Sequence, residues 1–207
     1  MKFNVNEIIK FLKNVYWDFK CSNIRGGYYR IRFKKSGRRL IIGKHCRINN
    51  PNNIVLGNNV IIDNNVELLV ESQDKKSDAR LILGDYVHLS KYNCIGCCNK
   101  IILENHVRLA PYVHITDRNH SFDNITIPIW KQPTITKEVF IGSETWIGFG
   151  AQIMPGVHIG RHCVIAAGSV VTKNIPDYCV AAGVPAKIVK QYNQNTQKWE
   201  KINTTIS

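Results

Sequence analysis

The chain has 207 residues, of which 44% are hydrophobic, and its 28 Lys and Arg against 15 Asp and Glu give a formal net charge of +13. This length suits one domain with a sizeable core. The apolar runs span only a few residues, which argues against a membrane span. Asn4, Asn6, Glu7 and Lys10 interrupt the apolar stretch that a secretory signal needs, so we expect a cytoplasmic protein.

Residues 1–40 form the first predicted segment. They carry a charge balance of +9, so the basicity of the chain is concentrated here. Four apolar residues at helical spacing predict one amphipathic helix: Ile8, Leu12, Val15 and Phe19. Cations and apolar residues alternate from Arg30 to Lys34, which predicts a strand with one cationic face.

The basic stretch over residues 25–39 has two interpretations. It is either a solvated cap on the end of the fold or a surface that attracts an acidic partner. That partner would be an anionic membrane surface, an acidic or diphosphate-linked glycan, or the phosphates of a cofactor. No recognised motif accompanies the charge, so we expect no nucleic acid.

An apolar residue then returns every six positions over residues 41–181, with some slips of phase. The early anchors are Ile42, Ile48, Leu56, Ile62, Leu83, Leu89, Ile95, Leu103, Leu109 and Ile115, and the most regular ones are Ile141, Ile147, Ile153, Ile159, Ile165 and Val171. Small or β-branched residues stand two places before the regular anchors, namely Val139, Thr145, Ala151, Val157, Cys163 and Ser169. This period predicts an all-β hexapeptide-repeat β-helix, followed by a C-terminal turn and tail over residues 182–207.

Two segments interrupt the repeat. The polar stretch over residues 71–80 has no periodicity and predicts a loop outside the coil. The excursion over residues 116–138 differs, because it contains a histidine, two prolines and Trp130. A long loop within a repetitive rod is commonly functional, so we expect chemistry there.

The seven cysteines match no disulfide framework. Cys94, Cys97 and Cys98 lie close together, but no second ligand pair stands at the spacing of a zinc finger. We therefore expect reduced thiols and no metal.

The chain from about residue 80 to 190 resembles the hexapeptide acyltransferases, in particular the maltose, galactoside and polysaccharide O-acetyltransferase branch. The resemblance rests on ITDRNHSF, on WIG, on AAGSVVTK and on GVPAK. It implies a left-handed parallel β-helix of triangular section, assembled as a homotrimer whose active sites lie in clefts between neighbouring subunits.

Within this resemblance, His120 occupies the position of the catalytic histidine. A sugar hydroxyl needs a base before it can attack a thioester, and histidine titrates in the right range. Asn119, His114 and Trp146 are expected to line the substrate cleft, and Asp117 is expected either to line it or to orient His120. What orients His120 stays open, because a backbone carbonyl would also serve.

The same resemblance implies acetyl-CoA as cosubstrate. The backbone N–H groups of Gly148 and Phe149 are candidates for the oxyanion site. The small residues Ala166, Ala167 and Gly168 would accept the pantetheine arm. The basic residues Lys173, Lys187 and Lys190 would bind the phosphates. Gly183 and Pro185 would shape the closing turn.

The sequence thus predicts direct acetyl transfer to a sugar hydroxyl of a surface polysaccharide or of its lipid-linked or nucleotide-linked precursor. The enzyme would work in the cytoplasm, with a peripheral contact at the inner face of the membrane as one option. Three alternatives stay open: a sugar N-acetyltransferase, a γ-type carbonic anhydrase with histidine-bound metal, and a scaffold without catalysis. The position that is acetylated is not defined.

Overall fold

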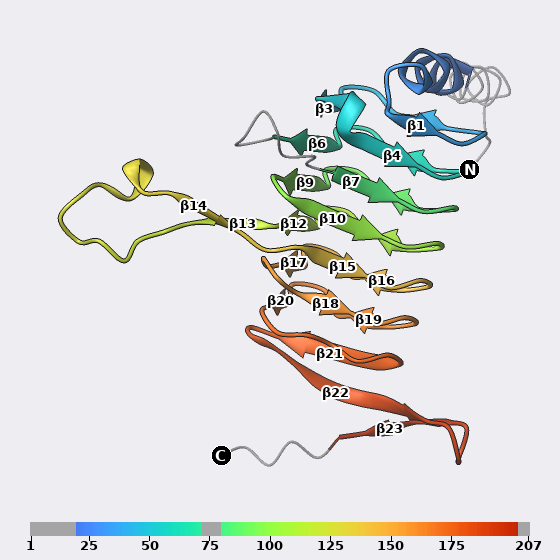
Figure 1. The fold of residues 1–207 in the computed structure, drawn as a ribbon. Coiled ribbons are helices and arrows are strands. Elements are labelled where there is room, and N and C mark those ends of the chain that lie inside the picture. The colour runs from blue at the N-terminus through green and yellow to red at the C-terminus, as the bar shows by residue number, and fades with distance from the viewer. Residues whose placement is uncertain (1–19, 72–79, 203–207) are drawn as a thin grey trace, which may run out of the picture.

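The computed structural model describes residues 20–71 and 80–202. The predicted helix built on Ile8, Leu12, Val15 and Phe19 lies outside these residues, and so does nearly all of the loop predicted at 71–80. The described chain winds into a rod in which each turn adds one short strand to each of three sheets (Figure 1). This is the predicted left-handed parallel β-helix.

Each sheet forms one side of the rod. Sheet A contains β1 (Lys35–Ser36), β4 (Ile54–Leu56), β7 (Arg80–Leu83), β10 (Lys100–Leu103), β15 (Val139–Ile141) and β18 (His158–Ile159). Sheet C contains β3 (Arg47–Asn49), β6 (Glu67–Val70), β9 (Cys94–Cys97), β12 (His114–Thr116), β17 (Gln152–Ile153) and β20 (Val170–Val171). Sheet B contains β2 (Ile41–Ile42), β5 (Ile61–Ile62), β8 (His88–Leu89), β11 (Arg108–Leu109), β16 (Trp146–Ile147), β19 (Val164–Ile165), β21 (Cys179–Gly183), β22 (Ala186–Asn193) and β23 (Lys198–Lys201).

The hexad anchors stack in register inside the rod. Ile147, for example, pairs with Leu109 on one side and with Ile165 on the other. Every predicted anchor is fully or almost fully buried except Ile48, which is partly buried. The small residues two places earlier also point inward, and Thr145 fits there because its hydroxyl donates to the carbonyl oxygen of Gly160 and accepts the Cys163 N–H. The predicted repeat is therefore confirmed.

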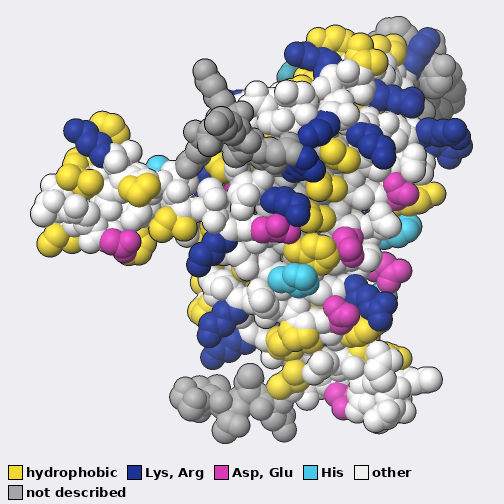
Figure 2. All heavy atoms as spheres, viewed as in Figure 1, with side chains coloured by type: hydrophobic (Ala, Val, Ile, Leu, Met, Phe, Trp, Pro, Cys, Tyr) yellow, Lys and Arg dark blue, Asp and Glu magenta, His cyan; other side chains and the backbone are white. Residues whose placement is uncertain are grey.

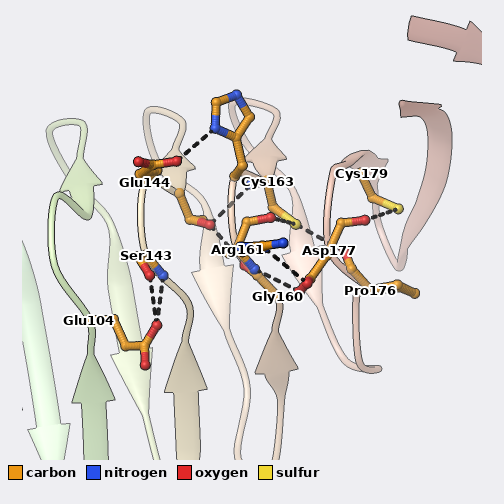
Figure 3. A network of polar contacts seen from close by, with 11 residues as sticks. Glu104, Ser143, Glu144, Gly160, Arg161, Cys163, Pro176, Asp177 and Cys179 are labelled. Atoms are coloured by element: carbon orange, nitrogen blue, oxygen red, sulfur yellow. Dashed lines mark hydrogen bonds and ion pairs between the residues drawn. The ribbon is translucent and has the colours of Figure 1, made fainter. Parts of the chain in front are cut away.

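Polar side chains tie successive turns together at the corner between sheets A and B (Figure 3). The carboxylate of Glu104 accepts hydrogen bonds from the N–H and the hydroxyl of Ser143 at 3.0 and 2.9 Å. The carboxylate of Asp177 accepts the Arg161 N–H at 2.9 Å. These side chains satisfy backbone groups that a corner would otherwise leave without partners.

The N-terminal segment differs from its prediction. Residues 20–30 are helical and 31–34 form a turn, so the strand predicted from Arg30 to Lys34 is absent from the described chain. The reason is that Tyr29 packs against the core and Phe33 is buried, a spacing that a helix and its closing turn satisfy. The coil also begins earlier than residue 41, because β1 already pairs with β4.

The C-terminal segment is more regular than a turn and tail. β21 is the last strand that pairs in parallel, with β19. β22 and β23 then continue sheet B as antiparallel strands over much of residues 182–207. Alternation of apolar and polar residues is weak in β22 and β23, which is why the hexad pattern did not reveal them.

A two-stranded arm leaves the rod between β12 and β15 and projects far from it (Figure 1). It consists of β13 (Arg118–His120) and β14 (Thr134–Thr136), paired antiparallel, with the 3-10 turn η2 (Ile129–Lys131) near its tip. A second 3-10 turn, η1 (Pro51–Asn53), lies between β3 and β4. Within the described residues, no helix is long and apolar enough to cross a membrane.

Candidate active site

The arm positions His120 outside the rod. His120 pairs with Thr134 across the hairpin, and its side chain is exposed. β-branched residues in β14 favour the extended backbone that this pairing requires. A cavity of about 230 Å³ lies beside the ring, lined by Asn119, His120, Ser121, Phe122, Asp123, Ile135, Lys137 and Pro155.

Of the residues around this cavity, the sequence analysis named only His120 and Asn119. Ser121 and Asp123 are hydrogen-bonded to each other at 3.1 Å and come from the same excursion. Pro155 comes from the turn after β17, and the N–H of Gly156 donates to the carbonyl oxygen of Lys137 beside it. The hexad phase indicates that residue 155 stands at a corner, but it does not indicate that the arm folds against that corner.

Asp117 does not line the cavity, which corrects its predicted role. Its side chain is fully buried, and one carboxylate oxygen accepts the N–H of Cys98 at 2.8 Å. The other accepts the N–H groups of Cys98, Asn99 and Lys100 at 3.1, 2.7 and 2.9 Å. The carboxylate is therefore used to hold the turn between β9 and β10 against the base of the arm, and none of these contacts is with His120.

His114 lies on β12, the strand that leads into the arm. Its neighbours across sheet C are Cys94 and Gln152, and Ile115 beside it points into the core. The imidazole is half-buried, and this burial lowers its pKa below the usual value. His114 therefore favours the neutral state on the outer face of sheet C.

The small residues predicted to accept the pantetheine arm lie at the corner between sheets B and C. Ala167, Gly168 and Phe149 are exposed there, and the N–H of Gly168 donates to the carbonyl oxygen of Phe149 at 2.7 Å. The ring of Phe149 contacts that of Tyr112, with centroids 5.3 Å apart. The corner therefore combines two exposed aromatic rings with the exposed small residues Ala167 and Gly168.

The amide of Gly148 is not free to bind an oxyanion, which corrects that prediction. Its N–H donates to the carbonyl oxygen of Ile165 at 2.8 Å in the regular pattern of the rod. A side chain here would also collide with the backbone of Ile165 and Ala167. Glycine is therefore required at 148 for the close approach of two turns, and the short side chain is not a sign of ligand binding.

The basic and turn-forming residues lie further toward the C-terminus. Lys173, Lys187 and Lys190 are exposed, and Lys190 lies on β22. Ala166 is partly buried, with its N–H bound to the carbonyl oxygen of Ala181. Gly183 is the last residue of β21, with a φ of 103°, and Pro185 lies in the turn between β21 and β22.

Trp146 lies in a different cavity, of about 420 Å³, on the outer face of sheet B. Its lining includes Glu144, His162, Lys190 and Trp199 but not His120. Glu144 and His162 approach to 3.1 Å (Figure 3), and this contact lowers the pKa of the Glu144 carboxyl. The sequence analysis did not single out this pair.

Within one protomer, His120 does not lie near the corner that holds Phe149, Ala167 and Gly168. β12 begins just after the corner that holds Phe149 and Tyr112, and it ends where the arm with His120 begins. The imidazole of His120 and the small-residue corner therefore lie at opposite ends of the strands of sheet C. In the described residues, no group of three or more potential metal ligands is found.

Comparison with known proteins agrees with the coil. Residues 138–173 match the bacterial transferase hexapeptide family of six repeats. A putative lipopolysaccharide biosynthesis O-acetyltransferase from Escherichia coli is 40% identical over 100 residues, which are 45% of this chain and 51% of that protein. A probable acetyltransferase from Mycobacterium tuberculosis is 45% identical over 82 residues, 40% of this chain and 27% of that protein. The chain thus spans about half or less of these relatives.

Solved structures show the same fold. An N-acyltransferase from Bacillus cereus, in complex with dTDP and 3-hydroxybutyryl-CoA, has a TM-score of 0.69 at 23% identity, over 83% of this chain and 90% of that one. A maltose O-acetyltransferase from Clostridium difficile has a TM-score of 0.53 at 27% identity, over 80% and 73%. Fold and repeats define a hexapeptide-repeat β-helix protein. Within that class, the chain is similar in sequence to proteins named as acetyltransferases.

Proposed function

We propose that this protein transfers the acetyl group of acetyl-CoA to a hydroxyl of a sugar. The observation that carries the proposal is the place of His120, on an arm that leaves the rod and beside a cavity. An imidazole in the closed interior of the prism could not reach two substrates. Relatives named as O-acetyltransferases support the same reaction.

His120 acts as general base. It takes the proton of the acceptor hydroxyl while that oxygen attacks the carbonyl carbon of the thioester. The C–O bond forms, the tetrahedral intermediate carries an oxyanion, and its collapse breaks the C–S bond. The imidazolium then returns the proton to the leaving thiolate, so no acyl-enzyme is required.

The amide of Phe149 is our candidate donor to the oxyanion. Unlike the amide of Gly148, it has no hydrogen-bond acceptor among residues 20–71 and 80–202. Ala166, Ala167 and Gly168 would run alongside the pantetheine arm, since their short side chains leave the backbone accessible. Lys173, Lys187 and Lys190 are exposed cations that would meet its phosphates.

The complete site requires a second copy of the chain. His120 and the corner at Phe149 lie at opposite ends of the strands of sheet C. The base of one protomer would therefore face the cosubstrate corner of its neighbour. A homotrimer closes such an arrangement, because each subunit then contributes His120 to one neighbour and the corner at Phe149 to the other. Sedimentation of the purified chain tests this, and a monomer with full activity would contradict it.

The acceptor we propose is a surface polysaccharide or its lipid-linked or nucleotide-linked precursor. Support comes from the lipopolysaccharide relative and from the arm, whose exposed Phe122 and Trp130 offer aromatic surface for sugar rings. Asn119 and Asp123, beside His120, can orient sugar hydroxyls by hydrogen bonds.

The test is release of the CoA thiol from acetyl-CoA in the presence of nucleotide sugars, oligosaccharides and amino sugars. We expect His120→Ala to lower kcat by about 10² to 10⁴. The matched control is His106→Ala, because His106 is exposed on another corner, where it stacks on Tyr86. Equal turnover by the parent and His120→Ala would remove His120 from the reaction, and transfer only to amino sugars would replace O-acetylation by N-acetylation.

A further inference from the structure

The end of the rod that carries the helix has an unbalanced charge. Residues 20–39, here called the cationic end, contain eight Lys or Arg and no Asp or Glu. Figure 2 shows dark blue and yellow side chains gathered at the top of the view, over the end where the helix lies in Figure 1. This surface is several turns of the rod away from the arm and takes no part in the proposed reaction.

One face of the helix docks on the rod. Ser22, Arg25, Gly26 and Tyr29 recur at helical spacing and are buried or partly buried. Arg25 donates from Nε to the carbonyl oxygen of Ile42 at 3.0 Å, and Gly26 leaves no room for a side chain against Leu40. This face is fully explained by packing and fixes the orientation of the helix.

The opposite face is apolar at its centre, although it points to solvent. Ile24 is 63% exposed and Tyr28 is 56% exposed, and Ile31, in the turn that follows, is 84% exposed. At 100° per residue, Ile24 lies about opposite the docked face. A solvated helix normally places polar residues there, so solvation alone does not explain this face.

Two arginines, Arg30 and Arg32, lie next to these apolar residues in the chain. Arg32 donates to the hydroxyl of Tyr28 at 2.9 Å and lies over its ring, 5.5 Å from the centroid. Arg30 is exposed on the flank of the helix. Arg38 and Arg39 are also exposed, but they lie beside Asp85 at a corner of the rod. Apolar residues with flanking Lys and Arg and an aromatic ring are the composition of helices that lie in the interface of an anionic bilayer.

We propose that the cationic end binds an anionic lipid surface, with Ile24, Tyr28 and Ile31 inserted at the boundary of the acyl chains. A soluble phosphate ligand would use the charges but would leave the two isoleucines unexplained. A neutral surface would use the isoleucines but not the charges. The inference does not depend on acetyl transfer, because it concerns a different end of the rod.

The test is sedimentation of the full chain with vesicles of phosphatidylcholine, with and without phosphatidylglycerol. We expect binding only to the anionic vesicles, and its loss at high salt. Arg30→Gln with Arg32→Gln should weaken binding about 25-fold, fivefold per cation, from roughly 1 kcal/mol for each basic residue near an anionic surface. Ile24→Ser with Ile31→Ser should weaken it by about 100-fold or more, since each inserted isoleucine is worth at least about tenfold.

The matched control is Lys198→Gln with Lys201→Gln, which makes the same charge change on β23, beyond the other end of the rod. All variants are checked for unchanged thermal unfolding by circular dichroism. Equal loss of binding in the control would overturn the inference, and so would equal binding to both kinds of vesicle. Binding of inorganic pyrophosphate without vesicle binding would assign the charges to a small phosphate ligand instead. Loss of oligomers in the isoleucine variant, with vesicle binding intact, would assign the face to contacts between copies.

Discussion

The buried carboxylate of Asp117 gives the sharpest test of how the arm is attached. Replacing Asp117 by Ala removes the acceptor for three backbone N–H groups, those of Cys98, Asn99 and Lys100. A hydrogen bond to a charged acceptor contributes about 1.5 to 3 kcal/mol. Cys98 is buried, whereas Asn99 and Lys100 reach solvent in part, so water replaces some of the loss. We expect Asp117→Ala to lower the free energy of unfolding by about 4 kcal/mol.

Asp117→Asn keeps the shape of the side chain but replaces one of its two acceptor oxygens by a donor. One amide oxygen remains to accept an N–H, but the amide nitrogen now faces the other donors, so we expect a loss of about 2 kcal/mol. Urea unfolding followed by circular dichroism measures both values, at one protein concentration because association would change the apparent stability.

Asp123→Asn is the matched control. Asp123 is an exposed carboxylate on the same arm, with a single hydrogen bond to Ser121, so its loss should be below about 0.5 kcal/mol. If Asp117→Asn is as stable as the parent and loses only turnover, then Asp117 belongs to the reaction and our account of the buried carboxylate is wrong.

Two further predictions concern stability. Burial lowers the pKa of His114 below 6.5, so the unfolded chain binds more protons than the folded one just below that pH. The contribution of His114 to the free energy of unfolding is therefore complete above about pH 6.5 and is lost as the pH falls toward the folded pKa. When the free energy of unfolding is measured in urea at several pH values, its slope against pH below 6.5 should be smaller in His114→Gln than in the parent. An equal slope in both would contradict this. Gly142→Ala would place a methyl group 2.7 Å from the backbone nitrogen of Arg161 and should cost about 2 kcal/mol, whereas Gly27→Ala, in open space on the helix, should cost nothing. Thermal unfolding compares the two alanines, and equal midpoints would refute the steric argument.

The rod could be predicted from sequence because its core is periodic. Each anchor such as Ile147 meets an equivalent residue one turn away, so one repeating rule describes most of the buried residues. The rule fails at the ends, where there is no further turn to stack on. Arg30 to Lys34 alternates like a strand, but Tyr29 and Phe33 find their packing as part of a helix and turn.

The candidate site was predicted only in part, for two physical reasons. A loop residue such as His120 is placed by hydrogen bonds between distant segments, and the pairing of His120 with Thr134 is not visible in the hexad pattern. The sequence also does not tell a polar residue that serves a turn from one that serves a substrate. Asp117 stands three residues from the histidine, yet its carboxylate is fully used by the backbone.

The way in which the arm joins the rod has a consequence for how such proteins diversify. Ile101 on β10 pairs with Val139 on β15, although the whole arm lies between them in the chain. The arm is therefore an insertion between two strands that pair with each other, and the rod stays continuous across it. An insert of another length or sequence can occupy this place while the pairing of β10 with β15 stays the same.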